Sequence, residues 1–152
     1  MLSLHDQRLL DLMSVPTAPF REENVRRHLT KLLTGHQVPF FTDKTGNIVV
    51  GAISKLDYES LLKSKDPEPL RIFIAHLDHP GVQGLEWLSK TELKVEWLGG
   101  SPTEHLEGAE LTLFDREGLE FKCRLTQPEM AAHGRALAKG VVVVPADFPQ
   151  ET

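Results

Sequence analysis

Apolar residues in the first 35 positions of the chain recur at helical spacing. Ser3 and Asp6 have the spacing of a helix-capping box, with Asp in place of the usual Glu. The apolar residues after them predict the buried side of a short helix: Leu9, Leu10, Leu12 and Met13. Glu22 and Glu23 predict the start of a second helix, because carboxylates suit the positive end of a helix dipole. Apolar residues recur on one face of this second helix at positions i, i+4, i+7 and i+8, namely Val25, Leu29, Leu32 and Leu33. Gly35 is expected to end the helix.

The pattern of apolar positions then changes to that of strands. Residues 38–42 and 48–52 are predicted as strands around the glycine-containing connection 43–47. Residues 54–69 are charged and polar, have room for one or two helical turns, and are expected on the surface. Residues 70–75 are almost continuously apolar, which predicts a strand buried on both faces of a sheet.

Short alternating strands and tight turns follow from residue 85 onward. Residues 93–97 alternate strictly between apolar and polar, and residues 115–118 give a second hairpin connection. Residues 141–144 predict another buried strand, which Pro145 ends. This region is therefore expected to form a small β-domain with a barrel-like shape.

The order of these elements predicts an α/β fold with an inserted domain. We expect residues 1–84 to be the N-terminal part of an α/β sheet domain and residues 85–140 to be the inserted β-domain. Residues 141–152 would carry the chain back toward the first domain. Two helices, a hairpin and one central strand do not cover both faces of a sheet. The chain is therefore expected to be a truncated first part of a longer protein.

Composition narrows the class of protein only a little. The chain has 152 residues, of which 40% are hydrophobic and 26% charged, enough for a packed core. Its net charge of −5 argues against a nucleic-acid-binding surface, which is usually basic. There is no basic leader before an apolar run, and no apolar stretch of the roughly 20 residues that span a bilayer, so we expect a cytoplasmic protein without a membrane role. The single cysteine, Cys123, lies in the apolar phase of a predicted strand and is expected to be a small core residue.

The most informative candidate site is the His-x-Asp sequence that ends the apolar run at residues 70–75. Ligands of open α/β sheets bind where strands reach their carboxyl ends. Side chains two residues apart on an extended chain point the same way, so His76 and Asp78 are expected to lie together. A carboxylate that accepts one imidazole N–H leaves the other ring nitrogen free to bind a metal. The pair thus predicts half of a metal site.

Four features of the chain, taken in order, resemble the glutamyl and deblocking aminopeptidases, the endoglucanase M-like family of dinuclear-zinc peptidases. They are Leu10-Asp-Leu-Met-Ser-Val-Pro16 with Glu22-Glu-Asn-Val-Arg26, then Asp43-Lys-Thr-Gly-Asn47, then Ile74-Ala-His-Leu-Asp78, and finally Leu98-Gly-Gly100 with Leu106-Glu-Gly-Ala-Glu-Leu111. The resemblance runs from about residue 4 to residue 145. His79 and Pro80 depart from it, since the family more often has an acidic and an aliphatic residue there, and residues 54–69 are an unusual insertion.

The resemblance implies a metal-dependent aminopeptidase that removes N-terminal residues from peptides by means of a metal-activated water. His76 would be a ligand of one of two divalent ions, zinc above all, with cobalt or manganese as alternatives. Asp78 would orient the His76 ring without touching the metal. The family's remaining ligands and its glutamate base lie beyond the inserted domain, so this chain is expected to be inactive on its own. The resemblance also implies a homo-oligomer.

The other residues that could carry chemistry have simpler interpretations. His79 is expected on the surface because Pro80 restricts its backbone, and His133 is expected to have a structural or rim role in the β-domain. Four further histidines are interpreted as surface residues without partners: His5, His28, His36 and His105. Trp87 and Trp97 are expected to pack the β-domain.

Two alternatives to the aminopeptidase stay open at this point. The first is a non-catalytic binding or regulatory protein that keeps half of the peptidase fold and binds a partner through its unpaired sheet edge. The second is a related zinc dipeptidase or deacylase, which shares the His-x-Asp element. The Leu98-Gly-Gly100 entry into the β-domain favours the aminopeptidase branch.

Overall fold

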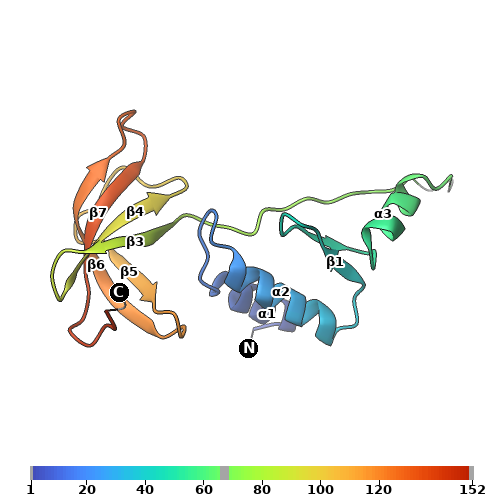
Figure 1. Cartoon of the computed structure of the whole chain (residues 1–152), viewed down its shortest axis with the longest axis horizontal. Helices are drawn as coiled ribbons and strands as arrows, with labels where there is room; N and C mark the ends of the chain where they lie inside the picture. Colours follow the sequence, from blue (N-terminus) through green and yellow to red (C-terminus); the bar gives the residue numbers. More distant parts are fainter. Residues whose placement is uncertain (1, 66–68, 151–152) are drawn as a thin grey trace. The chain divides into compact units, whose positions relative to one another are not determined.

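A computed structural model describes residues 2–65 and 69–150 of the chain. It has a mixed α/β fold with three helices, a two-stranded sheet and a five-stranded antiparallel sheet shaped as a half-barrel (Figure 1). The chain divides into two compact units. The first comprises residues 1–17 and 21–78, and the second comprises residues 18–20 and 79–152. No helix among the described residues is both long enough and apolar enough to cross a membrane.

The first unit opens with the two expected helices, α1 (Leu4–Met13) and α2 (Glu23–Gly35). The capping box is confirmed: the Ser3 hydroxyl accepts the amide of Asp6 at 3.1 Å, and the Asp6 carboxylate accepts the amide of Ser3 at 3.1 Å. The expected burial of the α1 face is wrong, because none of its residues is buried and Leu9, Leu10 and Met13 are exposed. The described part of the unit has no further layer that would cover this face.

A hairpin follows α2, formed by β1 (Phe40–Thr42) and β2 (Ile48–Val50) in antiparallel register. Both strands are shorter than expected, but the connection falls where the sequence predicts it, with Gly46 at φ +92°. This left-handed backbone favours glycine, which has no Cβ to collide with the following carbonyl. The charged excursion contains α3 (Lys55–Leu62), two turns long, whose start is capped by the Ser54 hydroxyl.

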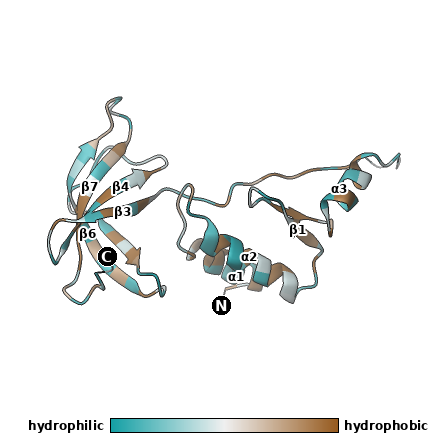
Figure 2. Ribbon diagram, viewed as in Figure 1, coloured by the Kyte–Doolittle hydropathy of each residue, from teal (hydrophilic) through white to brown (hydrophobic). Residues whose placement is uncertain are grey.

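Residues 70–75 depart most from the sequence prediction. They run as extended chain without a strand partner among the described residues, and their side chains are exposed, with Phe73 at 93% and Ile74 at 92%. Figure 2 colours parts of the extended segment that leads into β3 as hydrophobic. The prediction of a strand buried on both faces is therefore wrong for the described chain. An apolar segment is buried only where neighbouring strands and a covering layer are present. The described residues do not supply them for residues 70–75.

The second unit is an antiparallel sheet with a core of its own. Its strands are β3 (Gly81–Trp87), β4 (Glu92–Leu98), β5 (Glu110–Phe114), β6 (Glu120–Met130) and β7 (Leu137–Val143), in the spatial order β3-β4-β7-β6-β5. The side chains at the centre of the core are Val95, Leu125 and Val142, each at most 1% exposed. The expected hairpin at residues 115–118 joins β5 to β6, with Gly118 at φ +86°. The expected β-domain is thus confirmed in its coarse form, as a half-barrel.

Aromatic side chains pack against the core of this half-barrel. The ring of Phe148 lies 4.6 Å from that of Phe121 and 5.7 Å from that of Trp87, measured between centroids. Trp97 also packs against the core, and its indole N–H donates to the Gly100 carbonyl at 3.0 Å. The expectation that both tryptophans pack the β-domain is confirmed.

Candidate functional site

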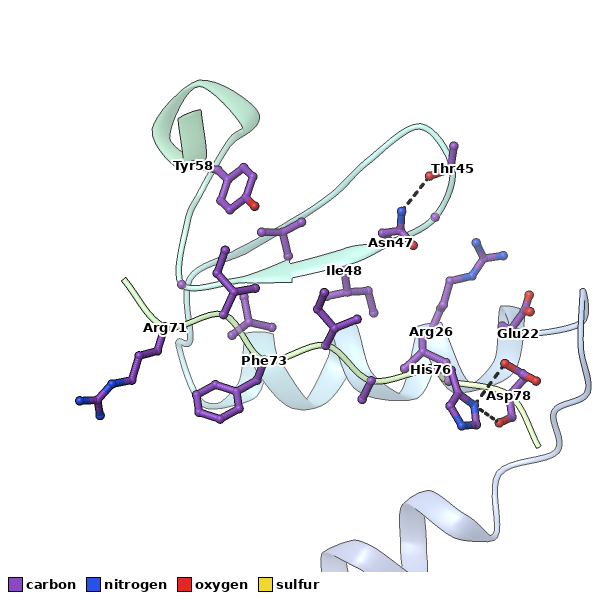
Figure 3. Close-up of a pocket in the computed structure, with 18 of the residues that line it drawn as sticks. Glu22, Arg26, Thr45, Asn47, Ile48, Tyr58, Arg71, Phe73, His76 and Asp78 are labelled. Atoms are coloured by element: carbon purple, nitrogen blue, oxygen red, sulfur yellow. Dashed lines mark hydrogen bonds and ion pairs between the residues drawn. The ribbon is translucent and has the colours of Figure 1, made fainter. Parts of the chain in front are cut away.

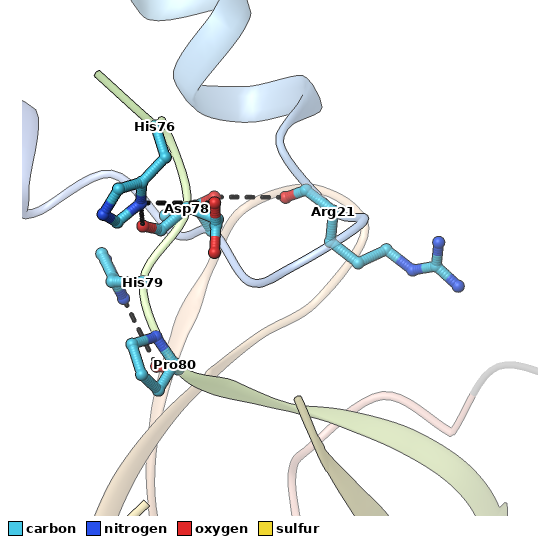
Figure 4. A network of polar contacts seen from close by, with 6 residues as sticks. Arg21, His76, Asp78, His79 and Pro80 are labelled. Carbon is cyan, nitrogen blue, oxygen red and sulfur yellow. Dashed lines mark hydrogen bonds and ion pairs between the residues drawn. The ribbon is translucent and has the colours of Figure 1, made fainter. Parts of the chain in front are cut away.

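His76 and Asp78 lie at the end of the extended segment in the first unit. The sequence predicts this pair at the carboxyl end of a strand. That prediction is wrong for the described chain, because residues 70–75 form no sheet with it. The two side chains are nevertheless close together, as their two-residue spacing predicts, with His76 Nδ1 3.4 Å from Asp78 Oδ1 (Figure 4). The local conformation therefore brings the two residues together without the sheet.

The nearer acceptor for the His76 ring is a main-chain group. Nδ1 of His76 lies 2.7 Å from the carbonyl oxygen of Asp78, well inside hydrogen-bond distance. A carbonyl oxygen only accepts, so Nδ1 must carry the proton, and the lone pair of a neutral ring is then on Nε2. The Asp78 carboxylate, which the sequence predicts in this role, is the more distant of the two acceptors.

The exposure of the pair suits a group that binds a ligand. The side chain of His76 is 82% exposed, whereas that of Asp78 is 30% exposed. Within residues 2–65 and 69–150, the structure gives Nε2 of His76 no hydrogen-bond partner. The arrangement presents a ring nitrogen with a free lone pair to solvent and holds the opposite nitrogen in place.

A pocket of about 960 Å³ adjoins the pair within the first unit (Figure 3). One wall is the end of the hairpin, including β2, and the other is residues 70–78. Figure 3 shows Glu22, Arg26 and Asp78 near His76 at one end of the pocket, and Arg71 at the opposite end. The pocket combines charged ends with an apolar middle.

Three charged residues that line the pocket are not predicted from the sequence: Glu22, Arg26 and Arg71. Glu22, the residue before α2, and Arg26 are four residues apart, a spacing that puts them on the same side of the helix start and could have indicated that they act together. The Arg26 guanidinium lies over Gly46, where a Cβ would collide with it, and it pairs with Glu23 at 3.3 Å. No local signal marked Arg71, because its position depends on how the later segment folds back.

The hairpin connection beside the pocket is fixed by Asp43. Its Oδ2 accepts a hydrogen bond from the side-chain amide of Asn47 at 2.9 Å. Its Oδ1 accepts the hydroxyl of Thr45 at 2.8 Å and the backbone amides of Thr45 and Asn47, each at 2.9 Å. These hydrogen bonds, those from the side chains of Asn47 and Thr45 above all, hold the pKa of the Asp43 carboxyl well below its usual range. The carboxylate therefore stays ionised as the centre of the turn.

The remaining candidates are exposed histidines and one buried thiol. His79 and His133 are both exposed, and Nδ1 of His133 accepts the backbone amide of Arg135 at 3.1 Å, a local contact within a turn. The expectation that His36 has no partner is wrong, because its Nε2 lies 3.0 Å from the guanidinium of Arg8. Cys123 is buried as expected, and burial raises the pKa of its thiol, which makes it a poor nucleophile.

The remaining histidines are expected to lie on the surface. His5 and His105 are exposed and His28 is half-buried. Among the described residues no group of three or more His, Cys, Asp or Glu side chains is arranged to hold a metal ion. His76 therefore fits the role of one ligand, and the described chain does not complete a metal centre.

Comparison with known proteins adds no identification. No protein-family model matches the chain, and no curated protein matches it in sequence.

Proposed function

We propose that this chain forms the N-terminal portion of a metal-dependent aminopeptidase, in which His76 binds one of two divalent metal ions. The observation that carries the proposal is the His76 ring itself, with Nδ1 held by the Asp78 carbonyl and Nε2 open to solvent. Metal-binding histidines ordinarily donate their second ring N–H to a carbonyl or a carboxylate, and this one is arranged in that way. The ordered sequence features around it supply the resemblance to the peptidase family.

The remaining ligands must come from outside the described residues. A catalytic zinc takes three protein ligands and keeps one position open, and the described chain offers one suitable imidazole. When bound, zinc, cobalt or manganese would lower the pKa of a coordinated water and so supply the attacking oxygen. The chain's own contribution is to hold the Nε2 lone pair outward, to keep Nδ1 protonated, and to place a pocket beside it.

The test compares two histidines of the same segment in the protein made from the complete reading frame. His76→Ala should lower the bound zinc per protomer and reduce the hydrolysis of an aminoacyl p-nitroanilide by more than about a hundredfold. His79→Ala is the matched control and should retain both, because that side chain is an exposed neighbour with no assigned role. Unchanged zinc content and turnover in the His76→Ala protein would refute the proposal.

The exposed apolar segment favours one other function, a binding role without catalysis. Residues 70–74 present four large apolar side chains to solvent: Leu70, Ile72, Phe73 and Ile74. Such a strand-like segment can pair with the edge of a partner's sheet. A protein of this kind would bind its partner equally well after His76→Ala and would show no metal-dependent hydrolysis.

A further inference from the structure

The aromatic cluster of the second unit includes one side chain that does not come from the sheet. Phe148 belongs to residues 145–150, which follow β7 and form no strand pairing among the described residues. Its ring contacts those of Trp87, the last residue of β3, and Phe121, near the start of β6. In the sheet, β4 and β7 lie between these two strands. The Phe148 ring therefore bridges two strands that do not pair with each other.

The segment at residues 145–150, which we call the strap, makes local and side-chain contacts. The N–H of Phe148 donates to the Pro145 carbonyl at 3.1 Å, which closes a turn inside the strap. The side-chain amide of Gln150 donates to the carbonyl of Ser89, in the turn between β3 and β4, at 3.0 Å. Proline has no N–H, so Pro145 cannot extend the hydrogen-bond ladder of β7 beyond this point. The strap is thus docked on the sheet without being part of it.

The side chains of the strap differ in exposure. Phe148 is half-buried, whereas Asp147 and Pro149 on either side of it are exposed. Contact with two aromatic rings favours the docked strap. The conformational entropy lost when an otherwise exposed segment is ordered opposes docking. Because these effects oppose each other, the strap can open locally while the core of the sheet stays intact.

We propose that the strap is detachable and that the space between Trp87 and Phe121, the aromatic slot, is a docking site that the chain fills with its own Phe148. When the strap opens, the five-stranded sheet stays folded and the slot is exposed as an apolar surface. When it closes, the Phe148 ring refills the slot. All of these residues belong to the second unit, so the inference does not depend on the proposed metal site of the first unit.

The test separates the strap from the slot within the whole chain. Phe148→Ala removes the ring, and a peptide with the sequence of residues 144–150 supplies it in trans. The NMR signal of the Trp87 indole N–H reports on the slot, and that of Trp97, whose indole donates to the Gly100 carbonyl, is the internal reference. The variant should stay folded, with the amides of β4, β6 and β7 protected, and its Trp87 signal should shift from the position in the unmodified chain.

Added peptide should return the Trp87 signal of the Phe148→Ala chain toward its original position in a saturable manner and leave that of Trp97 unchanged. A peptide with alanine in place of phenylalanine should bind at least about tenfold more weakly, since one buried aromatic side chain dominates a small contact of this kind. The unmodified chain should bind the peptide at least about tenfold more weakly than the variant does, because its tethered strap competes at a high effective concentration. Asp147→Ala, a change at an exposed strap residue, is the matched control and should behave as the unmodified chain.

Two results would overturn the proposal. Loss of amide protection throughout the second unit of the Phe148→Ala chain would show that Phe148 is a fixed part of the core. A folded Phe148→Ala chain whose Trp87 signal does not respond to the peptide would show that the slot does not accept the strap as a separate segment.

Discussion

The ring of His76 is held by the backbone of its own segment. The 2.7 Å contact from Nδ1 goes to the carbonyl oxygen of Asp78, while the Asp78 carboxylate is 3.4 Å away. A main-chain acceptor does not depend on the identity of the side chain. The tautomer that leaves Nε2 unprotonated is therefore set by how the chain turns after residue 76.

Removal of the Asp78 carboxylate should leave the His76 tautomer unchanged. In the Asp78→Ala chain, long-range ¹H–¹⁵N spectra recorded at about pH 9, above the ordinary imidazole pKa of about 6.5, should still show a protonated Nδ1 and an unprotonated Nε2. His5, exposed and distant in sequence, is the internal reference. A switch of the His76 proton to Nε2 in this variant would show that the carboxylate, and not the carbonyl, fixes the ring.

The Asp43 carboxylate should link the stability of the turn to acid pH. Because its pKa is lower in the folded chain than in the unfolded chain, its contribution is fully present above pH of about 4 and is lost as the pH falls below that value. A ¹³C titration of the carboxyl group should show the lowered pKa. Asn47→Ala should raise it toward the ordinary value, and Lys44→Ala, a turn residue outside these hydrogen bonds, should not. An Asp43 pKa near the ordinary value in the unmodified chain would contradict this account.

Elements that are specified by short-range signals agree best with the sequence. The capping box of α1, the start of α2 and the two glycine-containing hairpins all depend on residues within about five positions of one another, and all four form. The alternation in β4 also predicts which of its residues are buried. In each case the signal and the residues that respond to it are in the same short segment.

The sequence prediction fails for elements whose structure depends on segments that are distant in the sequence. The apolar run at residues 70–75 has the composition of a central strand, yet Phe73 and Ile74 are almost fully exposed. Periodicity cannot reveal whether neighbouring strands are present. The grouping of Glu22, Arg26 and Arg71 around one pocket was missed for the same reason, since it joins a helix start to a segment some 45 residues later.

Gly140 tests the packing within the β-sheet of the second unit. A Cβ at this position of β7 would lie 2.6 Å from Leu125 Cδ1 and 3.3 Å from the carbonyl oxygen of Thr126. Gly140→Ala should therefore destabilise the unit by about 1–3 kcal/mol through overpacking of a buried position, measured by urea unfolding. Gly100→Ala, which would meet no atom within 4 Å, is the control and should change stability little. Equal unfolding midpoints for the two variants would contradict the packing described here.

The two units of the whole molecule differ in how much core they possess. The second unit buries a cluster of nine residues that includes Val95, Leu125 and Val142. Among the described residues of the first unit, Val25 and Ala52 are the buried apolar side chains. Burial of apolar area is the main source of folding free energy, so the second unit is expected to be the more stable of the two.

Native-state hydrogen exchange should separate the units. Amides of β4, β6 and β7 should be the most protected, and those of α1 and α3 should exchange quickly. Leu125→Ala should destabilise the second unit by about 2–5 kcal/mol and lower protection there, with little effect on the first unit. A uniform loss of protection across both units would instead show that the chain unfolds as a single cooperative body.

The central claim is that His76 is one ligand of a peptidase metal centre completed by residues outside the described chain. The most direct test is to read the native coding region past the codon for Thr152. The account predicts that the frame continues and encodes an Asp-Asp pair, a Glu-Glu pair and a late histidine, as the resemblance to the aminopeptidases implies. A stop codon directly after Thr152 would contradict it, because a single imidazole does not hold a catalytic metal, and a binding role would then be the better account.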